Sequence, residues 1–426
     1  MHFQGLFGVA AILVTAVLLS AHRRHIRPRI VLTGLVLQVV LAFLCIADTP
    51  LVRVFDGLAT VVTRVISFAD AGTEFLFGKT ADPSGPWGFV FAIRVLPVII
   101  FFAALMSVLY HLRIMQVAVA GVAWVLRRVL GITGTEALSA AANIFVGQTE
   151  APLTVRPYIA GMTRSQIMSI MTGGFASIAG SVLVAYVALL GGETDESRIL
   201  FAKHLITASV MSAPGTFVIA KIMLPETEAP RDESLRSLIT EPLETRNVVD
   251  AAAVGATDGL RLALNVAAML VAFVALIALL NWPLAAFSRI DAVAAWRAAN
   301  GLPEFTFQNL LGYALRPLAW CMGAQWSESV AFGSLLGQQV IATEFVAYLD
   351  LAKKSASGEL SPRSVQIATY ALCGFANLPS IAIQIGGLSA LSPTRRADFA
   401  SIAPRAMVAG ALACWLSASI AGIFIG

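Results

Sequence analysis

Long apolar runs constrain the fold of this chain more than any other feature. Eight of them lie along the 426 residues, at roughly 4–20, 30–47, 88–110, 166–190, 200–223, 250–282, 364–390 and 403–425. A helix of about 20 apolar residues crosses the hydrocarbon core of a bilayer, which is about 30 Å thick. Only 13% of the residues are charged, against about 25% in soluble domains, so much of the surface must face lipid. The sequence therefore predicts an all-α polytopic membrane protein with eight transmembrane helices.

The arginines predict the orientation of these helices. The first loop, residues 22–29, contains four arginines, and the positive-inside rule places it in the cytoplasm. The N- and C-termini are then outside a cytoplasmic (inner) membrane, and the charged loop 224–247 is inside. Lys353 and Lys354 fall outside, against the rule. The net charge of +4 includes no basic block, so the sequence does not indicate a nucleic-acid partner.

Two apolar stretches, residues 114–160 and 286–352, are broken by glycine and polar residues. The first contains a short helical pattern that ends at Gly147-Gln148, and Thr149-Glu150-Ala151-Pro152 then has the hydroxyl cap, acid and proline of a helix start. Ser327 to Gln339 followed by Thr343-Glu344 repeats this order. Two half-helices that meet at a polar tip predict a re-entrant hairpin, because non-helical backbone at membrane depth must be buried or line a cavity.

The chain also resembles itself. Gly174-Phe175-Ala176-Ser177-Ile178 recurs 200 residues later as Gly374-Phe375-Ala376-Asn377-Leu378, and Trp124-Val125-Leu126-Arg127 parallels Tyr313-Ala314-Leu315-Arg316. Each repeat is predicted to contain an interfacial amphipathic helix, a hairpin and an interrupted span. Three crossings separate the repeats, so they are inverted, which is typical of secondary transporters with a substrate site at the midplane.

This repeat divides the chain into four segments. Residues 1–113 form the N-terminal spans, an interfacial helix and the third span, which serve as a scaffold. Residues 114–223 form the first inverted repeat, and 224–247 form the cytoplasmic loop. Residues 248–426 contain the sixth span and the second inverted repeat.

Two acids at the predicted hairpin tips are candidate binding residues. Glu150 and Glu344 lie within apolar sequence, where an acid marks a substrate or ion path by default. The alternative is a glutamate that reaches the membrane interface or pairs with an arginine. Gln148 and Thr149 lie beside Glu150 and provide further donors and acceptors for a polar ligand.

Polar residues also interrupt the seventh span. Asn377 and Ser380 flank Pro379, which leaves a backbone carbonyl without its helical donor. A proline kink in which both side chains bond the local backbone is the alternative. Phe375 offers an aromatic face near Asn377, although a phenylalanine here is more often a packing residue than a ligand platform. Asp258 is either a further acid on the pathway or an exposed residue without a role.

Oxygen atoms near the breaks could bind a cation. Asn143 and Ser177 have side-chain oxygens, and the backbone carbonyls of Val146 and Ile178 add two more. Unwound backbone combined with hydroxyl and amide oxygens is typical of Na⁺ sites in transporters. A hard cation prefers such oxygen ligands and needs no titrating group. Proton coupling would instead use an acid such as Glu150.

Four motifs together resemble the bacterial form of the concentrative nucleoside transporter family. They are Gly72-Thr73-Glu74-Phe75-Leu76-Phe77-Gly78, Gly147-Gln148-Thr149-Glu150-Ala151, Thr343-Glu344-Phe345-Val346-Ala347-Tyr348 and Cys373-Gly374-Phe375-Ala376-Asn377. The resemblance implies a cation-coupled symporter that imports nucleosides by alternating access, with eight spans, two re-entrant hairpins and a homotrimer in the lipid bilayer. It implies no enzymatic activity and no cofactor, with Na⁺ as the coupling ion.

The resemblance also implies roles for single residues. Those facing the nucleobase would be Gln148, Thr149 and Glu150, with Phe375 at its border. Those holding the ribose hydroxyls would be Glu344, Asn377 and Ser380. The Na⁺ ligands would be Asn143, Val146, Ser177 and Ile178. Two positions depart from the family pattern, Thr343 in place of the usual asparagine and Leu378-Pro379 in place of a pair such as Phe-Ser, and both bear on sugar selectivity.

Three other functions stay open on the sequence. The first is an H⁺-coupled nucleoside symporter, and the second is a transporter or channel for another small polar solute on the same scaffold. The third is an intramembrane enzyme that uses Glu150 and Glu344 as catalytic acids. The enzyme hypothesis lacks a nucleophile–base pair or metal ligands in the spans. Neither the preferred nucleosides nor the trimer follows from the residues themselves.

Overall fold

The computed structural model describes residues 3–47, 52–82, 85, 90–192, 194–231, 245–300 and 302–425. Every regular element within these ranges is helical. The start of the predicted third span at residues 88–89 lies outside the described residues. So do residues 232–244 of the predicted cytoplasmic loop.

The helices follow one another along the chain as two sets. The first set is α1 Gln4–Leu18, η1 Arg23–His25, α2 Pro28–Ile46, α3 Val52–Phe77, η2 Gly78–Ala81, α4 Phe91–Arg94, α5 Leu96–His111, α6 Ile114–Leu130, α7 Gly134–Asn143, η3 Ala151–Gly161, α8 Arg164–Ala176, α9 Gly180–Leu190 and α10 Asp195–Met223. The second set is α12 Val248–Ser288, α13 Asp291–Ala299, α14 Phe307–Cys321, α15 Ser329–Ile341, α16 Glu344–Ala356, α17 Pro362–Ala371, α18 Leu378–Leu391, η4 Pro393–Arg395 and α19 Arg396–Phe424.

Six helical segments in the described part of the chain are long and apolar enough to cross a bilayer. They are Pro28–Ile46, Phe91–His111, Arg164–Leu190, Asp195–Met223, Val248–Ser288 and Pro393–Phe424. The other two predicted spans are shorter helices in the structure, because α1 has 15 residues and the seventh span is divided between α17 and α18. The all-α membrane architecture is therefore confirmed, while the count of eight spans stays a prediction.

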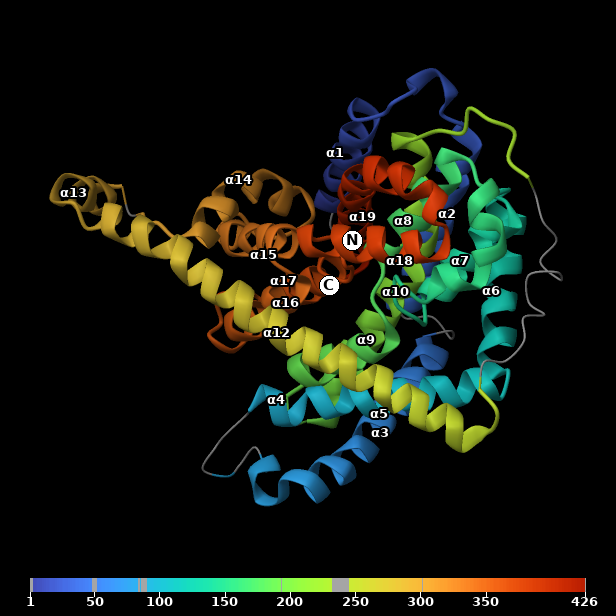
Figure 1. Ribbon diagram of the computed structural model, residues 1–426. Coiled ribbons are helices and arrows are strands. Elements are labelled where there is room, and N and C mark those ends of the chain that lie inside the picture. The colour runs from blue at the N-terminus through green and yellow to red at the C-terminus, as the bar shows by residue number, and fades with distance from the viewer. Residues whose placement is uncertain are drawn as a thin grey trace.

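The helices form two groups that differ in burial. In Figure 1, α12 runs along one side of the molecule with α5 beside it, and α8, α10 and α19 cluster away from them. More than three quarters of the apolar window in α8–α9, α10 and α19 is buried, against less than a quarter in α5 and α12. Glycine permits the close pairing of α12 with α5, since a Cβ on Gly255 would lie 2.7 Å from the carbonyl oxygen of Ala103.

The first repeat contains α6, α7, η3 and the interrupted pair α8–α9. Thr133 begins α7 with a capping box in which Glu136 bonds back to the backbone N–H of Thr133. The predicted cap by Thr149 is wrong, because η3 begins at Ala151 with Glu150 at its N-cap position and no side-chain cap. Pro157 explains why this arm of the hairpin is not a continuous α-helix, since its ring would clash with the carbonyl four residues earlier, and the backbone at Val155 is non-helical.

The second repeat contains α14, α15, α16 and the interrupted pair α17–α18. Thr343 caps α16 by accepting a hydrogen bond from the backbone N–H of Val346. Asn377 caps α18 by accepting one from Ser380 at 2.9 Å. The helix start predicted at Thr343-Glu344 is therefore present, so the second tip is more regular than the first.

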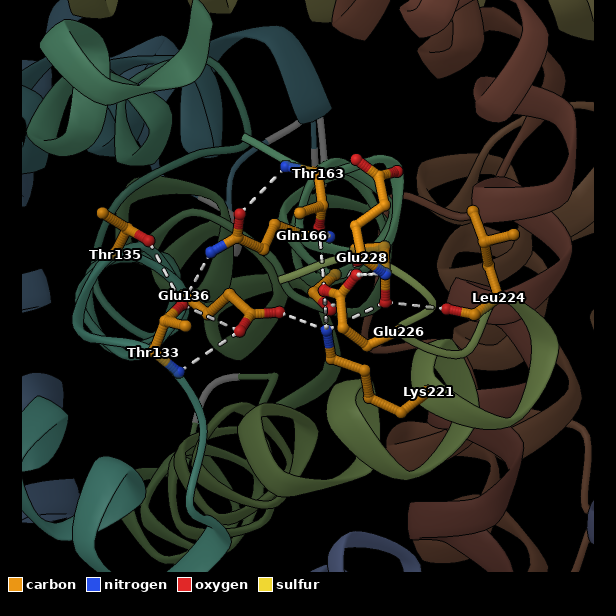
Figure 2. A network of polar contacts seen from close by, with 11 residues as sticks. Thr133, Thr135, Glu136, Thr163, Gln166, Lys221, Leu224, Glu226 and Glu228 are labelled. Atoms are coloured by element: carbon orange, nitrogen blue, oxygen red, sulfur yellow. Dashed lines mark hydrogen bonds and ion pairs between the residues drawn. The ribbon is translucent and has the colours of Figure 1, made fainter. Parts of the chain in front are cut away.

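A buried polar network closes the base of the first hairpin (Figure 2). The side chain of Gln166 bonds the backbone N–H of Thr163 and the hydroxyl of Thr133, which are the two ends of the hairpin. The ammonium of Lys221 on α10 lies 2.5 Å from Glu136 and 4.0 Å from Glu226. These contacts hold α7 against α8 and α10.

Candidate functional site

The two interrupted helix pairs contact each other at their breaks. The backbone N–H of Phe375 donates to the carbonyl oxygen of Ser177 at 3.3 Å, so the non-helical segments of the two repeats lie side by side. Gly374 permits this approach, because a Cβ there would lie 2.6 Å from the carbonyl oxygen of Phe175. Breaks 200 residues apart in the sequence therefore form one polar centre.

A chain of hydrogen bonds joins both hairpins to the start of α18. The amide nitrogen of Asn377 donates to Glu344 Oε2 at 2.7 Å, and the amide oxygen of Asn377 accepts from the backbone N–H of Ser380 at 2.9 Å. The hydroxyl of Ser380 accepts from Gln148 Nε2 at 3.3 Å. The structure thus brings together four of the residues that the sequence predicts as substrate ligands.

The acid at the second tip is enclosed. Glu344 is 3% exposed, and its Oε1 atom accepts a hydrogen bond from the hydroxyl of Tyr186 at 3.1 Å. The two groups that donate to this carboxylate, the hydroxyl of Tyr186 and the amide of Asn377, are neutral. No ion pair involves the carboxylate within the described ranges. The ring of Tyr186 is stacked on Tyr348 with the centroids 4.1 Å apart, which fixes the direction of its hydroxyl.

The acid at the first tip is exposed instead. The side chain of Glu150 is exposed, and its carboxylate lies over Gly147. A Cβ added to Gly147 would collide with this carboxylate. Thr149 is exposed too, and its methyl group faces Gly387 of α18. A Cβ added to Gly387 would lie 3.3 Å from this methyl group. Thr149 therefore lies against the same helix as Ser380, whereas Glu150 stays outside the chain of hydrogen bonds.

The amide of Gln148 has a second partner that the sequence did not reveal. Gln384, one helical turn after Ser380, is 2% exposed and donates to Gln148 Oε1 at 3.0 Å. Tyr186 and Gln384 are thus additional residues of the site. The one signal in the sequence was a single polar side chain within an apolar helix, which does not reveal its partner.

Asn143 has a buried side-chain amide. It is 2% exposed, and neither its oxygen nor its nitrogen has a hydrogen-bond partner among the described residues. Gly173 lets α8 approach it, since a Cβ there would lie 3.3 Å from Asn143 Nδ2. A buried polar group without a partner is costly, so a ligand at this position would be stabilised.

The other predicted cation ligands lie at adjoining non-helical segments. The hydroxyl of Ser177 donates to the Gly173 carbonyl at 2.8 Å, which leaves its oxygen lone pairs available. No backbone N–H within the described residues donates to the carbonyls of Val146 or Ile178. The N–H of Gly180 donates to the carbonyl of Phe145 at 3.0 Å, so these segments are close together. The oxygens available are of the kind a hard cation prefers.

Two remaining candidates lie at or beyond the edge of this centre. Phe375 is partly buried, and its backbone forms part of the contact between the breaks. Asp258 lies on α12 with its side chain 63% exposed and 3.5 Å from Arg261. The sequence left two alternatives for Asp258, an acid on the pathway or an exposed residue. The structure shows the exposed position.

Known proteins identify the family. The sequence profile described as "Na+ dependent nucleoside transporter C-terminus" matches residues 204–422, and its N-terminal counterpart matches residues 7–80. A third profile, described as "Nucleoside recognition", matches residues 92–193. The chain belongs to the concentrative, Na⁺-dependent nucleoside transporter family. Its members are membrane transporters, so the hypothesis of an intramembrane enzyme is wrong.

Relatives of this family match over nearly the whole chain. An uncharacterized transporter of Haemophilus influenzae is 43% identical over 99% of this chain and 98% of its own length. Sodium/nucleoside cotransporter 1 of Mus musculus is 38% identical over 98% of this chain and 63% of its own length. A structure of CNTnw in an inward-facing substrate-bound state superposes with a TM-score of 0.88 at 42% identity, covering 100% of this chain and 99% of that one.

Proposed function

We propose that this chain is a Na⁺-coupled symporter that imports nucleosides across the cytoplasmic membrane by alternating access. The observation that carries the proposal is the chain of hydrogen bonds from Gln148 through Ser380 and Asn377 to Glu344. It joins the two hairpin tips through a single helix start, so one small polar ligand could contact both hairpins at once. Movement of the hairpins relative to other helices would then carry that ligand.

The second tip is proposed to bind the sugar. Vicinal ribose hydroxyls can donate to a carboxylate and accept from an amide, which are the two groups that Glu344 and Asn377 provide. The hydroxyl of Ser380 completes this end. The hydroxyl of Tyr186 donates a hydrogen bond to Glu344 Oε1 and so orients the carboxylate toward the ligand.

The first tip is proposed to bind the nucleobase. Gln148, Thr149 and Glu150 provide the amide, hydroxyl and carboxylate groups that a base edge can pair with, and Phe375 would border the ring. The exposed position of Thr149 and Glu150 supports this role, because a ligand could reach these side chains from outside the protein.

Na⁺ is proposed to bind beside the first tip. Its ligands would be the side chains of Asn143 and Ser177 and the carbonyls of Val146 and Ile178. The amide of Asn143, buried without a partner in the described part of the chain, supports this assignment. Because the same segment ends in Gln148, Na⁺ bound there would order the tip and favour nucleoside binding.

For the assembly of the protein and its orientation in the membrane, we propose what the sequence predicts. Residues 1–113 would provide the scaffold, and the repeats 114–223 and 248–426, separated by the loop 224–247, would hold the site. Both termini would lie outside the inner membrane. The exposed apolar side chains of α12, such as Val271 and Leu279, would contact lipid or the neighbouring subunits of a homotrimer.

Uptake of labelled uridine into proteoliposomes tests this function. Uptake should rise with external Na⁺ at fixed pH and should stop when choline replaces Na⁺. Uptake that ignores Na⁺ and follows an imposed pH gradient would contradict Na⁺ coupling and favour Glu150 as a proton carrier. No uptake of any nucleoside under either gradient would contradict the substrate class.

A further inference from the structure

Gln384 lies between the first hairpin and α8. Its Nε2 atom donates both to Gln148 Oε1 and to the backbone carbonyl of Met171, each at 3.0 Å. Gly174 makes room for the pair, since a Cβ there would lie 2.5 Å from Gln384 Nε2 and 2.9 Å from Gln148 Cβ. The glycine that begins the first Gly-Phe-Ala motif is therefore required by this contact.

The Met171 carbonyl fixes the orientation of both amides. A backbone carbonyl only accepts, so the NH₂ group of Gln384 must face it, and the reversed amide would place its oxygen against the carbonyl oxygen of Met171. With its NH₂ group in this position, Gln384 also faces Gln148 as a donor. Gln148 must then turn its oxygen toward Gln384 and its NH₂ group toward Ser380.

One N–H of Gln148 remains available for a ligand. Ser380 is the acceptor for its Nε2 atom within the described residues, and a single hydroxyl takes one of the two hydrogens. The first tip thus presents a hydrogen-bond donor next to a residue of the proposed substrate site.

We propose that Gln384 is a positioning residue for nucleobase recognition. It locks Gln148 with the amide N–H directed to the substrate, so the site selects a base that offers an acceptor, such as a ring carbonyl. The inference rests on the proposed function, because it assumes that Gln148 contacts the base. It adds a residue that acts through Gln148 and a polarity for the contact.

A double-mutant cycle in Na⁺-driven uptake tests this role. Gln384→Met should raise the KM for uridine about three- to tenfold, which is the range for one neutral hydrogen bond, with little change in Vmax. In the Gln148→Ala background, Gln384→Met should have no further effect on KM, since the group it positions is gone. Gln38→Met is the matched control, because Gln38 is also buried and donates to a backbone carbonyl, that of Met211, without contacting the site.

A second variant gives a readout that a structural role would not change. In Gln384→Glu, the carboxylate gives up the bond to the Met171 carbonyl and opposes Gln148 with an acceptor. Only Gln148 can turn to relieve this, so it should direct its NH₂ group inward and present its oxygen to the base. Uridine should then lose more affinity than cytidine, which has an amino donor where uracil has its 4-carbonyl. Competition of each nucleoside against labelled uridine measures the ratio.

The outcomes separate this inference from the proposed function. Effects on KM that add in the double mutant, or an unchanged uridine-to-cytidine ratio in Gln384→Glu, would overturn the role of Gln384 while Na⁺-driven uptake by the parent protein stands. Absence of uptake by the parent protein would overturn the proposed function itself. Purified variants that elute as single species in detergent are compared, so loss of folding is excluded.

Discussion

Two buried polar regions of the first hairpin differ in how completely their groups are satisfied. At its base, the carboxylate of Glu136 faces the ammonium of Lys221, and the hydroxyl and amide groups of Thr133, Thr163 and Gln166 bond one another (Figure 2). At its tip, the Asn143 amide has no partner among the described residues. The charged groups at the base are therefore paired within the protein, whereas the tip retains a buried amide that the proposed Na⁺ would satisfy.

The same contrast separates the buried acids. Glu136 has a cation at 2.5 Å, and Glu344 has two neutral donors from Tyr186 and Asn377. A buried carboxylate without a cation is retained at a cost in stability. The comparison teaches that burial alone does not mark a binding acid, since Glu136 and Glu344 are equally buried and differ in whether a cation lies beside them.

The largest effect on transport is expected for Glu344→Gln. The carboxamide keeps the shape but loses charge-assisted bonds to ribose, worth about 1.5–3 kcal/mol each, so two such bonds predict a fall in uridine uptake of about 100-fold or more. Uptake into proteoliposomes measures it, with Glu359→Gln as the control, because Glu359 pairs with Lys354 at the surface. Near-normal uptake by Glu344→Gln would remove the acid from the binding site.

The largest effect on stability is expected for Lys221→Met. The change leaves Glu136 buried without its cation, which costs roughly 3–5 kcal/mol when one member of a buried pair is removed. The melting temperature in detergent should fall, and Glu136→Gln added to Lys221→Met should restore most of it. A melting temperature equal to that of the parent protein, together with lost uridine binding, would place this pair in the site instead.

A smaller effect is expected for Tyr186→Phe. Loss of one hydroxyl that orients Glu344 should raise the KM for uridine about tenfold while the fold is retained. Tyr348→Phe is the matched control, because Tyr348 is stacked on Tyr186 and its hydroxyl donates to the Thr369 carbonyl instead. Equal KM values for the two variants would mean that the hydroxyl of Tyr186 does not act on the substrate.

The smallest effect is expected for Gln148→Ala. Loss of a neutral hydrogen bond to the base should raise the KM for uridine and for deoxyuridine by the same factor, about three- to tenfold. Both substrates are measured in the same proteoliposomes. A selective loss of either sugar would show that the assignments of the two hairpins are reversed.

The sequence was sufficient for the all-α membrane class and for the residues at the breaks. The internal repeat located both non-helical segments, and the caps Thr343 and Asn377 follow ordinary helix-start chemistry. The first tip differs because Pro157, inside the arm, disfavours an α-helix that Thr149 could cap.

Partners distant in the sequence could not be predicted. Tyr186 meets Glu344 across 158 positions, and Gln384 meets Gln148 across 236. Each of these is a single residue within an apolar helix, so no spacing rule links it to its partner. Thr133-Gly134-Thr135-Glu136 did contain a signal, since a hydroxyl residue followed three positions later by glutamate indicates a capping box.

Calorimetric titration of uridine into the purified protein, in Na⁺ or in choline, tests most directly whether the unsatisfied groups at the first tip bind the coupling ion. Uridine should bind tightly in Na⁺ and weakly in choline, and Asn143→Ala with Ser177→Ala should shift the dependence to higher Na⁺ concentrations while binding at saturating Na⁺ is retained. Equal affinity for uridine in Na⁺ and choline, or an unchanged Na⁺ dependence in the double variant, would contradict a Na⁺ site at Asn143.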